Sequence, residues 1–172
     1  MAVEEENVLS NVTEEAEGPS EDTVQFLTFS VENSEYGVDI MKVMEIRGWS
    51  DTTRIPNAPD YMRGVINLRG LVIPIFDLRT RFGQGVTEAN EKNVVIVIAV
   101  GKRTIGILVD AVSDILTVGT SEVKDAPASN ETDIDDDYIN GLISVEEKMV
   151  VLLDVEHLFD KDTLAEAEKV SA

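Results

Sequence analysis

The chain has 172 residues, of which 34 are acidic and 14 are basic, so its formal net charge is −20. A chain this acidic repels the phosphates of nucleic acids and of anionic lipids, which excludes both as expected partners. It has no cysteine, which excludes a disulfide framework, a thiol nucleophile and a thiolate metal site. The longest apolar run, Val94 to Val100, is too short to span a bilayer. We therefore expect a cytoplasmic protein without direct membrane insertion.

The N-terminal segment differs in composition from the rest of the chain. Residues 1–23 carry eight acidic side chains and no lysine or arginine, and they show no apolar periodicity. This pattern is typical of a disordered acidic tail. The body of the chain follows over residues 24–160, and residues 161–172 are predicted to form a C-terminal tail or a short helix.

The first part of the body, about residues 24–86, reads mainly as short strands. Alternating and apolar runs predict strands over 24–31, 35–40, 65–68 and 71–76. Residues 41–46 fit either a helical turn or another strand, and residues 51–59 read as a loop. Arg69-Gly70 predicts a tight connection between the last two strands. Pro74 cannot donate to a strand ladder, so we place it at an edge or a bulge. Residues 78–82 fit a helical turn.

The second part, about residues 92–160, predicts the same order of elements. Strands are expected over 92–100, 104–109, 138–145 and 149–153, with a helical turn over 155–159. Residues 119–137 are polar and acidic and are predicted to form a long loop.

The two parts can be aligned with each other without gaps. Placing 26–46 over 95–115 matches Gly37 with Gly106, and placing 64–82 over 141–159 matches Gly64 with Gly141 and Asp77 with Asp154. This similarity predicts two copies of one β-unit. Each copy is too small to be stable alone, so we expect a mainly β fold of two small five-stranded barrels packed on a shared core. The alignment leaves open whether the barrels exchange strands.

The residue types that enzymes and metal sites require are not gathered in any recognisable motif. The single histidine, His157, aligns with Thr80 and reads as an ordinary surface or packed histidine rather than a general base. Asp133–Asp137 begins like a calcium loop but lacks the glycine and the final acidic residue of that pattern. We therefore expect no catalytic residue, metal or cofactor. A carboxylate-based enzyme on a β-scaffold and a calcium-binding module remain the alternatives.

Basic residues concentrate in one stretch of the chain. Residues 42–81 contain seven Lys or Arg against four Asp or Glu, a local charge of +3 within a chain of −20. Such asymmetry indicates either a surface that meets an acidic or polar partner, or arginines that balance nearby carboxylates of the same fold.

Several strings of residues resemble a known family. The segment from Tyr36 to Gly48 is similar to the YGIDILKVQEIRG segment of the CheW family of bacterial chemotaxis coupling proteins. The run from Gly64 to Arg79 resembles the GVINLRG and PIVDLR motifs of the same family. The segments 54–59, 109–116 and 138–142 match further parts of it. The resemblance covers about residues 24–160.

This resemblance implies two SH3-like barrels and a non-enzymatic adaptor. Members of the family join the cytoplasmic tips of methyl-accepting chemoreceptors to the regulatory domain of the histidine kinase CheA, in an array that associates with the membrane through its partners. Other CheW copies in the array are further candidate partners. The resemblance implies receptor-facing positions at Val43, Glu45, Ile46, Gly64, Asn67 and Arg69, and it assigns no kinase-contact residues. An adaptor of another receptor–kinase pathway, or part of a larger coupling protein, is the alternative within this class.

Overall fold

The structure, a computed structural model, describes residues 22–125 and 138–159. Most of the predicted acidic tail, the Asp133–Asp137 motif and the predicted C-terminal tail or helix lie outside the described residues. The described chain contains ten strands: β1 (Thr23–Val31), β2 (Ser34–Asp39), β3 (Val43–Gly48), β4 (Met62–Leu68), β5 (Leu71–Asp77), β6 (Val94–Val100), β7 (Arg103–Val109), β8 (Ala111–Gly119), β9 (Ile139–Val145) and β10 (Lys148–Leu153). Short helical turns are η1 (Ile40–Lys42), α2 (Leu78–Arg81), η2 (Thr120–Glu122) and α3 (Val155–Leu158).

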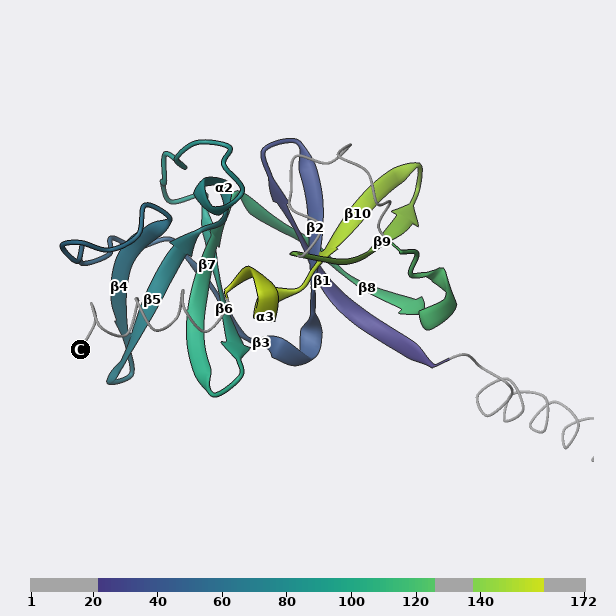
Figure 1. The fold of residues 1–172 in the computed structure, drawn as a ribbon, viewed down its shortest axis with the longest axis horizontal. Coiled ribbons are helices and arrows are strands. Elements are labelled where there is room, and N and C mark those ends of the chain that lie inside the picture. The colour runs from purple at the N-terminus through teal and green to yellow at the C-terminus, as the bar shows by residue number, and fades with distance from the viewer. Residues whose placement is uncertain (1–21, 126–137, 160–172) are drawn as a thin grey trace, which may run out of the picture.

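The strands form two five-stranded sheets that stand side by side (Figure 1), in the orders β8-β1-β2-β10-β9 and β3-β6-β7-β5-β4. We call them sheet A and sheet B. Each sheet mixes strands from both halves of the chain. In sheet A the hairpin β1–β2 lies between β8 and β10, and in sheet B the hairpin β6–β7 lies between β3 and β5. The strands are therefore exchanged between the two units, a point that the alignment left open.

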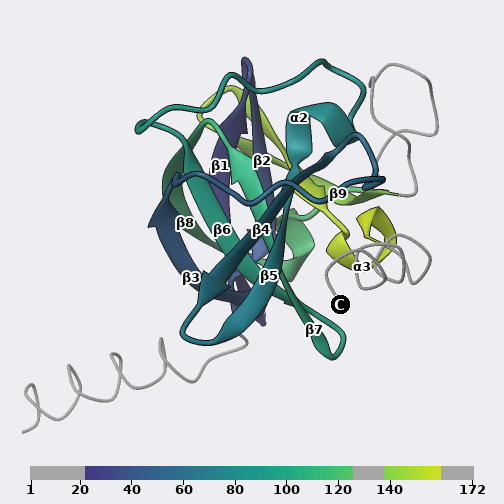
Figure 2. The same ribbon diagram turned by 90° about the vertical axis from the view of Figure 1, so that its left-hand side faces the viewer.

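Each sheet curls until its two edge strands approach each other, but among the described residues no strand ladder closes it. The chain just after β3 makes one bridge to β4, between Thr53 and Val65. The chain after β8 makes a matching bridge to β9, between Lys124 and Leu142. The curl of sheet B is seen from its open side in Figure 2. The predicted mainly β fold of two five-stranded units is confirmed, with open rather than closed barrels.

Apolar residues pack into three clusters. The largest lies between the sheets and includes Phe29, Tyr36, Phe76, Ile96 and Phe159. A smaller cluster fills the inner face of each sheet, around Ile75 in sheet B and Leu152 in sheet A. Strand β6 has an unbroken apolar sequence because both of its faces are covered, one by the central cluster and one by the inner cluster of sheet B.

Two local details differ from the sequence prediction. Strand β5 lies between β7 and β4, so the predicted edge or bulge position for Pro74 is wrong: Pro74 pairs regularly with Val65, and the ladder to β7 begins only at Ile75. Pro74 has no backbone N–H to donate, and at its position β5 is paired with β4 but not with β7. Strand β8 was not among the predicted strands, and it occupies the first residue of the predicted long loop.

Two aspartates hold the ends of the sheets in the same way. Asp77 accepts a hydrogen bond from the backbone N–H of Arg79 and begins α2. Asp154 accepts from the N–H groups of Glu156 and His157 and begins α3. A carboxylate at this position satisfies the free N–H groups of the first helical turn. Figure 1 shows α3 in the space between the two sheets, next to the central cluster.

Candidate interaction face

The residues predicted to face a receptor lie on the two edge strands of sheet B and on the turn beside one of them. Val43, Glu45 and Ile46 belong to β3, Gly64 and Asn67 belong to β4, and Arg69 is in the β4–β5 turn. The two edges are far apart in the strand order, and the curl of the sheet brings them together. We call this region, with the neighbouring side chains Met44, Leu71 and Val72, the β3–β4 face.

An ion pair links the two edges of the face. Arg69 Nη2 lies 2.8 Å from Glu45 Oε2, and 75% of the arginine side chain remains exposed against 30% of the glutamate. An ion pair this open to water contributes at most about 1 kcal/mol to folding. The ion pair orients the guanidinium of Arg69. The exposed N–H groups of this guanidinium can then donate to carboxylate or carbonyl groups of a partner.

The turn that carries Arg69 has a defined conformation. Arg69 and Gly70 have φ values of 53° and 89°, and a two-residue hairpin turn of type I′ requires positive φ at both positions. The amide oxygen of Asn67 accepts a hydrogen bond of 2.8 Å from the N–H of Gly70. Asn67 therefore holds the turn in place, and Arg69 is presented at its tip.

Apolar side chains are also exposed on β3 and β5. Ile46 is 44% exposed and Val72 is 46% exposed, whereas Val43 packs on the central cluster and fixes the start of β3. A shallow hollow of about 310 Å³ lies between the two edges and is lined by residues that include Arg47, Asn67 and Val72. The sequence prediction missed Arg47 and Val72, because their place on the face depends on the curl of the sheet.

Gly64 is on the predicted list, but the structure places it in the interior. It is buried, its φ is 142°, and a Cβ added to it would lie 2.4 Å from the carbonyl oxygen of Thr53. At this point the Thr53–Val65 bridge crosses the opening of the sheet, with two backbone hydrogen bonds of 2.9 Å. Gly64 therefore contributes to the face by letting the chain after β3 pack closely on β4.

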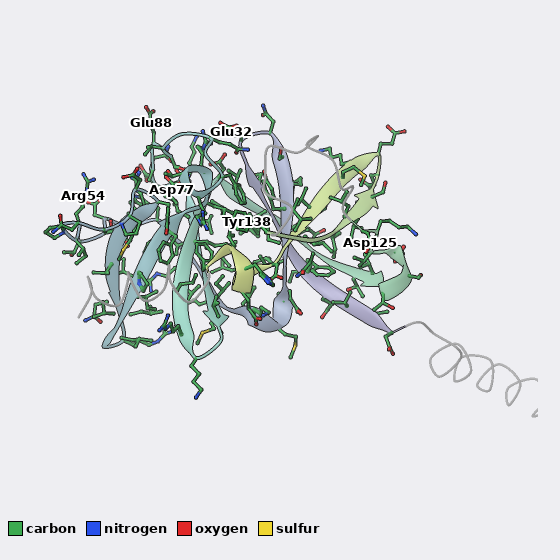
Figure 3. The ribbon with its side chains drawn as sticks, viewed as in Figure 1. Glu32, Arg54, Asp77, Glu88, Asp125 and Tyr138 are labelled. Atoms are coloured by element: carbon green, nitrogen blue, oxygen red, sulfur yellow. The ribbon has the colours of Figure 1, made fainter. Side chains whose placement is uncertain are left out.

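A buried network next to the face accounts for part of the basic stretch. Asp77 is fully buried, accepts hydrogen bonds from the N–H and hydroxyl of Thr87, and lies 3.7 Å from Arg63. Arg63 also donates to the carbonyl of Thr87 and stacks over the Trp49 ring at 5.5 Å. In Figure 3, Asp77 lies inside sheet B while Arg54 projects at its outer end. These contacts tie the loops after β3 and α2 to β5.

Arginines also join the two sheets. Arg79 of α2 contacts Glu32, in the β1–β2 turn of sheet A, at 3.3 Å, and Asp110, in the connection from β7 to β8, at 2.9 Å. Arg81 stacks between the rings of Tyr61 and Tyr138, at 5.0 and 4.8 Å. Several arginines of the basic stretch therefore balance carboxylates or rings of the same fold, while Arg69 and Arg54 are exposed.

The remaining candidates for a functional site are the histidine and the clustered acidic side chains. The ring of His157 is exposed and its Nδ1 lies 2.5 Å from Asp154, the residue that caps α3. Within residues 22–125 and 138–159, no group of three or more His, Cys, Asp or Glu could hold a metal ion. Among the same residues, no helix is long and apolar enough to cross a membrane.

The sequence is similar to those of known chemotaxis proteins. The family model of the CheW-like domain matches residues 25–163. The chemotaxis protein CheW of Klebsiella aerogenes is 43% identical over 147 residues, which cover 86% of this chain and 88% of that protein. The CheW of Bacillus subtilis is 32% identical over 139 residues, covering 81% of this chain and 88% of that protein.

A solved structure gives the same result for the fold. The scaffolding protein TtCheW from Thermoanaerobacter tengcongensis superposes with a TM-score of 0.75 at 28% identity, over 85% of this chain and 94% of that one. With a family model over most of its length and close relatives of similar size, this chain belongs to the CheW family of chemotaxis proteins.

Proposed function

We propose that this chain is a non-enzymatic chemotaxis adaptor that couples the cytoplasmic tips of methyl-accepting chemoreceptors to the histidine kinase CheA. Its family membership supports this role, since the relatives are named as chemotaxis and scaffolding proteins. We place it in the cytoplasm, where it joins a membrane receptor array through its partners. The regulatory domain of CheA and other copies of the adaptor would be its neighbours in that array.

The observation that carries the proposal is the Arg69–Glu45 pair at the centre of the β3–β4 face. A receptor tip is a bundle of helices, and a helix that lies on a shallow apolar surface needs a few directional contacts to fix its register. Ile46 and Val72 supply exposed apolar area. The guanidinium of Arg69, which pairs with Glu45 but remains largely exposed, supplies the directional contact.

The remaining predicted residues act in support of these contacts. Asn67 fixes the turn below Arg69, Val43 anchors β3 on the central cluster, and Gly64 allows the close packing that brings the two edges together. In this account Glu45, Ile46 and Arg69 touch the receptor, whereas Val43, Gly64 and Asn67 position them.

A binding measurement tests the proposal directly. The full chain is titrated with a soluble helical fragment of a methyl-accepting chemoreceptor tip, and Arg69→Asp is compared with Arg54→Asp. Both changes reverse the charge of an exposed arginine on the sheet B side, but Arg54 lies outside the β3–β4 face. We expect Arg69→Asp to weaken binding about tenfold or more, as for a central interface arginine, and Arg54→Asp to have little effect. Equal losses for the two variants would refute a specific role for the face.

A further inference from the structure

The sulfur atoms of this chain are all thioethers, because it has five methionines and no cysteine. Four of the methionines lie in the described structure and differ widely in exposure. Met41 is 87% exposed, Met44 is 60% exposed and Met149 is 50% exposed, whereas Met62 is buried at 7%. An oxidant in solution therefore reaches three of the four sulfur atoms and is kept from the fourth.

One of the exposed methionines, Met44, lies at the β3–β4 face, and a second, Met41, lies just before the strand that carries it. Met41 is in η1, immediately before β3, and Met44 stands between Val43 and Glu45, two of the predicted receptor-facing positions. The Sδ atom of Met44 accepts a weak hydrogen bond of 3.7 Å from the hydroxyl of Thr104. The family segment quoted above has leucine and glutamine at these two positions.

An exposed methionine suits an apolar contact with a helix, because its flexible and polarisable side chain adapts to an irregular surface. Conversion to the sulfoxide changes that property. The sulfoxide oxygen is a strong hydrogen-bond acceptor that costs free energy when it is buried against an apolar partner without a donor. Oxidation at the face would therefore weaken binding without disturbing the core, since neither Met41 nor Met44 is buried.

We propose that Met41 and Met44 form an oxidation-sensitive site through which hydroperoxides weaken receptor binding; this rests on the proposed function. In each event the thioether sulfur attacks one peroxide oxygen, the S–O bond forms and the O–O bond breaks. The sulfur is oxidised to the sulfoxide, and hydrogen peroxide is reduced to water. Methionine sulfoxide reductases, with a thiol reductant, would reverse the step.

The experiment uses the full chain and hydrogen peroxide as the oxidant. Peptide mass spectrometry follows sulfoxide formation at each methionine, with buried Met62 as the slow internal reference. Binding to the chemoreceptor-tip fragment is then measured before and after oxidation. The same is done for the double variant Met41→Leu/Met44→Gln and for Met149→Leu, a matched control that removes an exposed thioether from sheet A.

We expect Met41 and Met44 to be oxidised well before Met62, and bound receptor fragment to slow oxidation of Met44. Oxidation should weaken binding about tenfold, the factor that corresponds to about 1.4 kcal/mol. The Met41→Leu/Met44→Gln variant should keep its affinity after peroxide treatment, and Met149→Leu should lose affinity as the wild type does.

Two results would overturn the inference. One is unchanged affinity of a wild-type protein in which Met41 and Met44 are fully oxidised, and the other is an equal peroxide-dependent loss in the Met41→Leu/Met44→Gln variant. Lack of binding by the untreated, folded protein is a different outcome, because it would contradict the proposed receptor role itself.

Discussion

The substitution Gly64→Ala tests whether this glycine acts through packing rather than through contact with a partner. Its added Cβ would lie 2.4 Å from the carbonyl oxygen of Thr53 and 2.9 Å from the hydroxyl of Thr52, and both are too close for any real contact. The backbone would also have to hold an alanine at a φ of 142°. Strain of that kind costs about 1–3 kcal/mol, and overpacking costs a further 1–3 kcal/mol or so. We expect a loss of about 2–6 kcal/mol in the free energy of unfolding.

The measurement is urea unfolding followed by the fluorescence of Trp49, the only tryptophan of the chain. Gly48→Ala is the matched control, because Gly48 lies in β3, has no positive φ, and has open space where a Cβ would go. The control should change stability by less than about 0.5 kcal/mol. Wild-type stability in Gly64→Ala would refute the packing argument, and so would an equal loss in both variants.

Three further predictions concern other parts of the fold. Asp77→Ala removes the acceptor for Thr87 and leaves Arg63 without its buried carboxylate. We therefore expect chemical denaturation to show a free energy of unfolding that is lower by about 3–5 kcal/mol. Glu147→Gly should raise the free energy of unfolding by about 1 kcal/mol, because Glu147 has a φ of 69° that glycine adopts without strain; a lower denaturation midpoint would contradict this. Arg69→Ala should change stability by less than about 1 kcal/mol while it lowers receptor binding, because the side chain is 75% exposed; a large loss of stability would instead make Arg69 a structural residue.

Most of the strands could be predicted from the sequence because their apolar patterns are unambiguous. The run Val94–Val100 and the turn at Arg69-Gly70 gave clear signals, and both lie where they were expected. Strand β8 gave a weaker signal, since its middle residues Ser113 and Asp114 are exposed and polar at the edge of sheet A. The sequence of an edge strand does not by itself identify the strand with which it pairs.

The exchange of strands between the two units could not be predicted for a physical reason. An internal alignment shows which segments are alike. The alternation of apolar and polar residues is satisfied equally well when each unit keeps its own strands and when the units exchange them. The observed arrangement is selected by contacts between distant segments, such as β1 with β8 and β3 with β6. The same limit applies to the face: Glu45 and Arg69 are 24 positions apart, and only the curl of sheet B brings their charges within 2.8 Å.

The predicted site residues divide into two groups once the structure is considered. Ile46 and Arg69 are exposed and available to a partner, while Gly64 is buried and Asn67 uses its side-chain oxygen within the turn. A resemblance between sequences marks both groups equally, because a residue that positions a contact is needed as much as the contact itself. Exposure and hydrogen bonding separate them.

Coupling of receptors to a kinase through the β3–β4 face can be measured as CheA autophosphorylation in receptor-containing membranes. The rate is measured without the chain, with the wild type, and with folded Arg69→Asp and Arg54→Asp variants. We predict that the wild type and Arg54→Asp activate the kinase and that Arg69→Asp fails to do so. Full activation by Arg69→Asp, or no activation by a folded wild type beside an active kinase and its own receptors, would contradict this coupling.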